Sequence, residues 1–378
     1  MKLLAKTFAG LEDVLANEID QLGGQNVRII RRGVEFEGDK RLLYQANLEL
    51  RTALRILMPI AHFKAQNDRV LYQKVQEIDW SKHMDIRQTL AVDAVVRSTF
   101  FTHSQYVGLK TKDAIVDQFR ERYNKRPNVN TVSPDLLINI HVNEDDITIS
   151  LDASGDSLHK RGYRVDTLEA PINEVLAAGM IQLSGWDKKS DFTDAMCGSG
   201  TLLTEAAMLA YKIPPQYGRE YFCFKRWLDF DQELFDDIIK NQSAQVADFQ
   251  HHITGNDLSF QAIRVTERNV EAATLTGKID LKRKDFFKLE AQNIAENEPP
   301  KGGILMLNPP YDERLKLEDA QAFYKQIGDT MKKNWKGWQV WIISGNLEAV
   351  KAVGLKPAKR ITLFNGAIEC KFLKFDVY

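Results

Sequence analysis

The C-terminal half of the 378-residue chain alternates between strand-like and helix-like segments, and this alternation restricts its fold most. This half ends in two extended runs that are joined by Asn365-Gly366, a dipeptide typical of tight hairpins. Alternation of this kind favours a doubly wound, mostly parallel sheet with the hairpin as an antiparallel edge. We therefore predict an α/β, Rossmann-like domain over residues 169–378. Its strands are expected at 191–197, 251–257, 280–287, 302–308 and 338–345, and its helices at 171–186, 201–211, 258–275 and 320–335.

The N-terminal half has a different pattern and is expected to form two small α+β domains, at residues 1–65 and 66–156. The first alternates short strands with helices, and the second contains a strand, a helix at 104–124 and a hairpin that turns at Asn143–Asp146. Residues 157–168 carry glycine, serine and charge without periodicity, which indicates a linker. The apolar side of the 104–124 helix is expected to contain Tyr106, Leu109, Ala114, Val116 and Phe119.

Composition narrows the class of protein. Hydrophobic content of 44%, charged content of 27% and a net charge of −1 are typical of a soluble globular chain without a global basic field. The three cysteines are widely separated, which argues against a disulfide framework or a zinc site. No apolar run approaches the ~18 residues of a membrane span. We expect a cytoplasmic protein without a bound metal.

A glycine-rich turn, "DAMCGSG", joins the strand at 191–197 to the helix at 201–211. Gly198 and Gly200 allow a tight turn and a close approach to a ligand, while the following helix points its first amides at the turn. Alone, this pattern fits NAD, a flavin or S-adenosylmethionine (SAM), or a plain turn with no ligand. We interpret Cys197 as a packing residue rather than a nucleophile, since no His or Lys lies beside it in sequence.

Three successive strands end in an aspartate, and this series favours SAM. Asp194 precedes the glycines, where a carboxylate would repel a pyrophosphate but suits a cationic ligand. Asp257 is placed to accept both ribose hydroxyls, and Asp285 with Phe286 to contact the amine and face of adenine. Each acid alone could be a helix cap, but together they indicate a nucleoside site at the carboxyl edge of the sheet. The predicted cofactor site comprises Asp194, Cys197, Gly198, Gly200, Asp257, Leu258, Asp285 and Phe286.

The strand at 302–308 ends in Asn308, Pro309, Pro310 and Tyr311, which we predict to be the catalytic residues. An exocyclic amine on a base is a poor nucleophile because its lone pair is delocalised into the ring. The Asn308 side-chain oxygen and the Pro309 carbonyl could accept its two N–H groups and aim the lone pair at the methyl group of SAM. The prolines restrict the backbone in advance, and Tyr311 could stack on the base.

"DAMCGSG" and "NPPY", with the intervening acids, resemble class I SAM-dependent methyltransferases that act on amino nitrogens. Over nearly all its length the chain resembles the THUMP-containing guanine-N2 methyltransferases of 23S ribosomal RNA, which are also described as N6-adenine-specific DNA methylases. The resemblance implies a ferredoxin-like domain, a THUMP RNA-binding domain and a Rossmann-like catalytic domain. Two departures stand in the motifs: Ala195 where Pro is common, and Asp312 where Gly often follows the Tyr.

Residues 97–126 form a local basic segment, with seven Lys/Arg and three acids (7 − 3 = +4) and interleaved aromatic residues. Such a segment suits phosphate contacts, but equally a solvated helix face. "SLHKRGYR" near the domain junction could meet RNA or join the domains. The aromatic-rich insertion at 211–250 could be a lid over the target base or a packing element. The predicted RNA contacts are Lys110, Lys112, Arg120, Lys160, Arg161, Arg164, Lys225 and Arg226.

Alternative functions stay open at this point. The amine chemistry of "NPPY" would serve N6 of adenine in DNA or RNA as well as N2 of guanine, and a glutamine amide on a protein is disfavoured by the basic N-terminal half. A NAD-dependent oxidoreductase needs an acid about 20 residues past the glycines. Glu220 is near that spacing but lies in the insertion, not at a strand end. A non-enzymatic RNA-binding role requires a vestigial cofactor pocket, although no key residue is lost.

Overall fold

The computed structural model describes residues 1–168, 171–291, 302–310 and 317–378. The chain divides into two compact units. Unit 1 contains residues 1–6, 16–158 and 219–240, and unit 2 contains residues 7–15, 159–218 and 241–378. Residues 219–240, predicted as part of the insertion, therefore belong to the same unit as the N-terminal part of the chain.

Unit 1 is built on one eight-stranded sheet with the order β2-β3-β1-β4-β8-β7-β5-β6. The long strand β4 pairs with β1 on one side and with β8 on the other, both antiparallel. Residues 1–65 and 66–156, expected as two small domains, thus share a continuous sheet, and the boundary between them remains a prediction. The strands are β1 (Lys2–Lys6), β2 (Gln25–Ile30), β3 (Gly33–Glu37), β4 (Arg55–Lys64), β5 (Thr89–Arg97), β6 (Asn128–Val129), β7 (Leu136–Asn143) and β8 (Asp146–Asp152).

Two helices of this half, α2 and α3, begin at polar caps. The Asp39 side chain accepts from the Leu42 amide at the start of α2 (Lys40–Glu49), and Asn67 caps α3 (Asp68–Gln76), which the sequence did not predict. In α4 (Ser104–Tyr123), Ala114, Val116 and Phe119 are buried as expected. Tyr106 and Leu109 are instead 50% and 51% exposed, because the first turns of α4 bury the opposite face, at Val107, Gly108 and Thr111. Helix α1 (Glu12–Gln21) crosses the division between the units.

Within unit 1, residues 219–240 pack against helix α2 through aromatic side chains. A 3₁₀ turn at Cys223–Arg226 precedes α7 (Gln232–Ala244). Phe224 stacks on Tyr44 of α2 with ring centroids 4.6 Å apart, and the Tyr44 hydroxyl accepts from the Asp231 amide at 3.0 Å. Arg41 and Asp237 form an ion pair at 2.7 Å. These contacts favour a packing role for this part of the insertion over a lid.

Unit 2 contains the predicted doubly wound sheet, in the order β11-β10-β9-β12-β13-β15-β14. The five strands β11, β10, β9, β12 and β13 run parallel to one another, and the β14–β15 hairpin adds the expected antiparallel edge. Strand β9 lies between β10 and β12, so the order of strands reverses there. The strands are β9 (Phe192–Asp194), β10 (Ile253–Asp257), β11 (Asp280–Arg283), β12 (Ile304–Leu307), β13 (Gln339–Ser344), β14 (Lys359–Asn365) and β15 (Ile368–Asp376).

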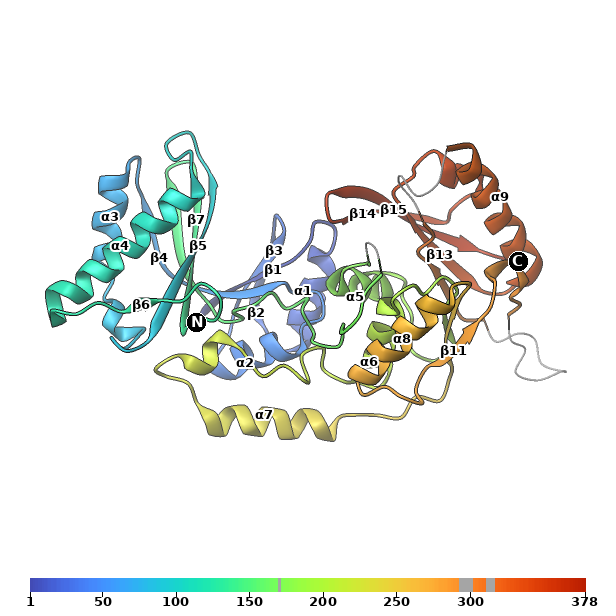
Figure 1. Ribbon diagram of the computed structural model, residues 1–378, viewed down its shortest axis with the longest axis horizontal. Helices are drawn as coiled ribbons and strands as arrows, with labels where there is room; N and C mark the ends of the chain where they lie inside the picture. The colour runs from blue at the N-terminus through green and yellow to red at the C-terminus, as the bar shows by residue number, and fades with distance from the viewer. Residues whose placement is uncertain (169–170, 292–301, 311–316) are drawn as a thin grey trace. The chain divides into compact units, whose positions relative to one another are not determined.

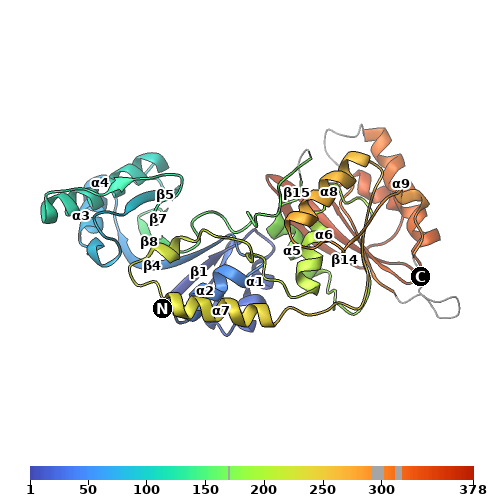
Figure 2. The same ribbon diagram turned by 60° about the horizontal axis from the view of Figure 1, so that its bottom comes forward.

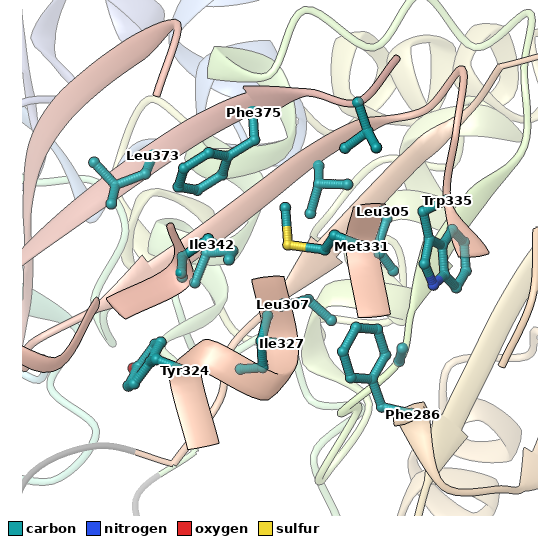
Figure 3. Packing of buried hydrophobic residues seen from close by; sticks show 14 of the residues in the cluster. Phe286, Leu305, Leu307, Tyr324, Ile327, Met331, Trp335, Ile342, Leu373 and Phe375 are labelled. Atoms are coloured by element: carbon teal, nitrogen blue, oxygen red, sulfur yellow. The ribbon is translucent and has the colours of Figure 1, made fainter. Parts of the chain in front are cut away.

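Helices cover both faces of this sheet, as right-handed crossovers require. Helices α5 (Glu174–Leu183), α6 (Thr201–Ala210) and α8 (Phe260–Ala272) lie on one face, and α9 (Leu317–Asn334) lies on the other (Figures 1 and 2). Tyr324, Ile327 and Met331 of α9, together with Trp335 just after it, point at the buried strands β12, β13 and β15 (Figure 3). This core fixes the carboxyl end of β12, where the predicted catalytic motif begins.

Candidate functional site

The glycine turn has the tight geometry that its sequence predicts. Gly198 and Gly200 have φ values of 55° and 77°, in the left-handed region that favours glycine. A Cβ atom on Gly200 would lie 2.5 Å from the Thr266 side chain, so α8 packs directly against the turn. The Thr266 hydroxyl also donates to the Gly198 carbonyl at 2.9 Å. Helix α6 begins immediately afterwards at Thr201, with its first amides toward the turn.

Asp257, at the end of β10, is joined to this turn. One carboxylate oxygen accepts from the Gly198 amide at 3.0 Å and the other from the Ser259 amide at 2.8 Å. A carboxylate oxygen can accept more than one hydrogen bond, so both retain capacity for ribose hydroxyls. The predicted ribose contact therefore also orients the glycine turn.

Asp194, at the end of β9, is 1% exposed, and within the described part of the chain no cationic side chain pairs with it. Burial raises the pKa of Asp194 to about 8; a hydrogen bond from the Met196 amide opposes this rise, and the charge of Asp257 adds to it. A buried carboxyl without a cation is suited to a ligand that brings a positive charge, as the sequence predicts. The residues present at this site therefore fit SAM.

Asp285 and Phe286 follow β11. The Asp285 carboxylate caps the short 3₁₀ turn Phe286–Lys288 by accepting from the Phe287 amide at 3.1 Å. Phe286 is buried beneath α9, whereas Leu258, after β10, is exposed. Cys197 is buried against Thr266, and burial raises the pKa of its thiol well above the usual value. A thiol held protonated in this way suits the expected packing role.

Asn308 follows β12 directly, beside the end of β9, because Met306 and Asp194 are paired in parallel register. Its side-chain oxygen is buried and has no hydrogen-bond partner in the described residues. A buried acceptor without a partner costs roughly 1–3 kcal/mol, so its place here calls for an external donor. Pro309 is buried, and Tyr311 and Asp312 lie outside the described residues.

These groups surround one cavity of about 1020 Å³ in unit 2. Seven of the eight predicted cofactor residues line it, all except Gly200, and so do Asn308, Pro309 and Pro310. A second part of the lining was not predicted from the sequence: the end of the linker with the residues that follow it, one residue of α9 and the tip of the β14–β15 hairpin. "APIN" and the Asn-Gly turn indicated structure there but not a site. The missed residues include Thr167, Leu168, Pro171, Ile172, Phe323, Asn365 and Ile368.

Three of the predicted RNA contacts come together in unit 1. Lys110, Lys112 and Arg120 of α4 line a hollow of about 620 Å³, which Arg126 and Asn128 complete. Acids accompany these cations: Lys112 lies 2.6 Å from Asp113, and Arg120 lies 2.6 Å from Asp117. The hollow therefore combines cations with acids, and its role in RNA binding remains a prediction.

The remaining predicted RNA contacts are placed differently. The Arg161 side chain is 1% exposed and pairs with Glu205 at 3.2 Å, which corrects the expectation that it meets RNA, because a buried arginine cannot reach a phosphate. Arg164 is largely buried in an ion pair with Glu174. Lys160 is exposed, so its assignment stays a prediction.

In the insertion, Arg226 pairs with Asp135 at 3.1 Å and lies over the Tyr221 ring, while Lys225 lies over the Phe235 ring. Both cations therefore contribute to packing within unit 1, and their RNA contacts stay predictions. Across residues 1–168, 171–291, 302–310 and 317–378, no cluster of His, Cys, Asp or Glu could hold a metal ion. Among the helices of these residues, none contains an apolar stretch of the length that a membrane span needs.

Three family profiles match the chain. They describe an RMKL-like methyltransferase domain at residues 161–374, a THUMP domain at residues 65–152 and an RlmL ferredoxin-like domain at residues 2–57. The matches confirm the predicted succession of domain types, and they contradict the oxidoreductase alternative.

Among curated proteins, the chain is 37% identical over 377 residues to "Putative RNA methyltransferase slr0064" of Synechocystis sp., covering 99% of this chain and 96% of that protein. It is also 37% identical over 385 residues to "Ribosomal RNA large subunit methyltransferase K/L" of Syntrophotalea carbinolica, covering 100% of this chain and 54% of that protein. The chain thus spans about half the length of the K/L relatives that it matches.

Solved structures are similar over the whole chain. A crystal structure of SMU.472, "a putative methyltransferase complexed with SAH", has a TM-score of 0.89 at 29% identity and covers 100% of this chain and 98% of its own. A "predicted N6-adenine-specific DNA methylase" of Listeria monocytogenes has a TM-score of 0.87 at 25% identity and covers 100% and 96%.

Proposed function

Because the chain belongs to the family of RMKL-like methyltransferases with THUMP and ferredoxin-like domains, we propose that it methylates RNA on an exocyclic amine. The target that we propose is N2 of a guanine in large-subunit (23S) ribosomal RNA. Support for an RNA substrate comes from the THUMP match and the Synechocystis relative, and support for ribosomal RNA comes from the K/L relatives.

One observation carries the choice of an amine: the buried side-chain oxygen of Asn308, which has no hydrogen-bond partner among the described residues. Two N–H groups on the amine need two acceptors, and the Pro309 carbonyl would be the second. Accepting both N–H groups favours a pyramidal nitrogen with a localised lone pair. Asn308 would therefore bind the reacting nitrogen in its activated form more strongly than in its flat ground state.

SAM, when bound, supplies an electrophilic methyl group on a sulfonium. The glycine turn and Asp257 would hold its ribose, Asp285 and Phe286 its adenine, and Asp194 its positively charged end. As the nitrogen–carbon bond forms, the carbon–sulfur bond breaks, and the methylated amine then loses a proton to water. No side chain needs to take that proton beforehand, so the protein contributes orientation and charge rather than general base catalysis.

A nucleoside-resolved assay tests this proposal. Purified protein is incubated with labelled SAM and either ribosomal RNA from cells that lack the protein or genomic DNA, and each product is digested to nucleosides. We expect label in N2-methylguanosine from RNA and none from DNA. Label in N6-methyladenine would instead support the adenine alternative. That alternative is favoured by the similarity of this chain to the Listeria protein and by the amine chemistry that the two reactions share. Label in neither substrate would contradict the proposal.

A further inference from the structure

The buried Asn269 and the largely buried Arg164 hold the end of the linker beside the glycine turn. Of the two, only Arg164 was predicted from the sequence to contact RNA. Thr167 and Leu168 at the end of the linker, and Pro171 and Ile172 after it, line the cavity of unit 2. Asn269 and Arg164 themselves are not among the described residues that line the cavity.

Asn269 of α8 uses all four of its hydrogen-bonding positions between the linker and the turn. Its side-chain oxygen accepts from the amides of Val165 and Asp166, each at 3.1 Å. Its side-chain nitrogen donates to the carbonyls of Asp166 at 3.0 Å and Ser199 at 2.9 Å. Ser199 is the residue between the two glycines. Because Asn269 is only 1% exposed, water cannot replace these bonds without a structural change.

Arg164 makes a second connection at the other end of the same segment. One amino group of its guanidinium donates to the Ile172 carbonyl at 2.7 Å and to the Thr201 hydroxyl at 3.0 Å. The same nitrogen lies 3.3 Å from the carboxylate of Glu174, the first residue of α5. Ile172 and Thr201 both line the cavity, from the segment after the linker and from the start of α6 respectively. A single guanidinium therefore joins the linker, α5 and α6 beside the cavity.

We propose that Asn269 and Arg164 are positioning residues of the SAM site, which hold Val165, Asp166 and Ile172 in place beside the glycine turn and the start of α6. They act through Ser199, Thr201 and Ile172 and do not touch the ligand. The inference rests on the methyl-donor site of the family and is independent of the RNA base that is methylated.

Binding of SAM, measured by calorimetry on the purified full chain, tests the inference separately from activity. We expect Asn269→Ala and Arg164→Met each to raise the SAM Kd by about tenfold or more, because the first change removes four hydrogen bonds and the second removes two hydrogen bonds and an ion pair. The measurement is made well below each variant's unfolding midpoint, so that it reports on folded protein. In both variants kcat, which is measured at saturating SAM, should stay closer to the wild-type value than kcat/KM for SAM does.

Matched controls come from unit 1. Asn47 is a buried amide that bonds to the Leu43 carbonyl and the Ser154 hydroxyl, and Arg55 joins the buried Asp152 to the Gly155 carbonyl. We expect Asn47→Ala and Arg55→Met to lower the unfolding temperature while the SAM Kd of folded protein stays unchanged. An equal rise in Kd for the controls, or an unchanged Kd for Asn269→Ala and Arg164→Met, would overturn the inference.

A double-mutant cycle keeps the inference testable if Asn269→Ala fails to fold. Thr201→Val keeps the shape of the side chain but removes the acceptor of the Arg164 bond, together with a 3.4 Å contact between the Thr201 and Ser199 hydroxyls. If Arg164 acts through that bond, Arg164→Met raises the SAM Kd less in the Thr201→Val protein than in the wild type. Strictly additive effects would contradict the role proposed for Arg164.

Discussion

At the scale of single residues, Asn308 combines a structural cost with a chemical use. Its buried side-chain oxygen has no hydrogen-bond partner within the described part of the chain, which lowers stability, so its place at the carboxyl end of β12 is best understood through the ligand that would pair with it. Pro309 and Pro310 limit the conformations of the backbone that follows, so little freedom remains to be lost when the amine binds.

Asn308→Ala should lower methyl transfer by about 100-fold or more while the SAM Kd stays near that of the wild type, because the missing acceptor acts on the nitrogen in the transition state. Single-turnover kinetics and calorimetry measure the two quantities on one preparation. A parallel loss of SAM affinity would mean that Asn308 binds the cofactor, contrary to the role proposed.

Asp194 leads to a prediction about protons. Its pKa of about 8 means that the ligand-free protein carries a proton there at pH 7, and a cation bound beside it would lower the pKa and release that proton. Because the deprotonated carboxylate attracts the cation more strongly, the SAM Kd should fall as the pH rises toward about 8. Above that pH Asp194 is already deprotonated in the free protein, so it should contribute no further change. Calorimetry in buffers of different ionisation enthalpy counts the protons released.

Asp194→Asn provides the matched comparison, since the amide resembles the protonated acid in size and charge. This variant should lose the fall in SAM Kd that the wild type shows as the pH rises toward about 8, and should bind SAM about as well as the wild type at low pH. A proton count that is identical in the two proteins would show that the release comes from another group.

At the scale of elements, the sequence was most informative where local patterns match the final fold. Alternation with period 2 or 3.6, three strand ends with aspartate and the Asn365-Gly366 turn predicted the sheet of unit 2 and most of its site, because each signal is local. The lining at Thr167, Leu168, Pro171 and Ile172 was missed, since its proximity to the turn depends on bonds from Asn269 and Arg164 that no local pattern encodes. Arg161 was misassigned for the same reason, as its partner Glu205 lies 44 residues away.

The insertion supplies a prediction at this scale. Phe224 is fully buried between aromatic rings of unit 1, so Phe224→Ala should destabilise the protein by about 3–5 kcal/mol. Its SAM Kd in the folded state should stay unchanged, because a packing element does not contribute to the cavity. Chemical denaturation followed by fluorescence measures the loss.

Leu228→Ala, at an exposed position of the same insertion, serves as the control and should change stability by less than about 0.5 kcal/mol. If residues 219–240 were a lid, the opposite result would appear: Phe224→Ala would reduce methyl transfer at nearly wild-type stability.

At the scale of the whole molecule, the net charge of −1 is the sum of acidic and basic groups that gather at different sites. The acids at the strand ends of unit 2 surround the cofactor cavity, and the cations of α4 gather at a hollow in unit 1. An RNA substrate would be attracted by a local field rather than by the protein as a whole, so its binding should depend on salt and on few cations.

Arg120→Glu tests this separation. Replacing a cation of the hollow should weaken RNA binding and reduce the slope of log K against log salt by about 0.7–0.9 for each phosphate that the protein no longer neutralises, while the SAM Kd stays unchanged. Lys351→Glu is the control, because both residues are exposed and pair with an acid three positions earlier, Arg120 with Asp117 at 2.6 Å and Lys351 with Glu348 at 2.8 Å. Filter binding over a range of salt concentrations gives both slopes. Equal weakening in the two variants would assign RNA attraction to total charge, and unchanged binding in both would remove the hollow of α4 from the RNA-binding surface.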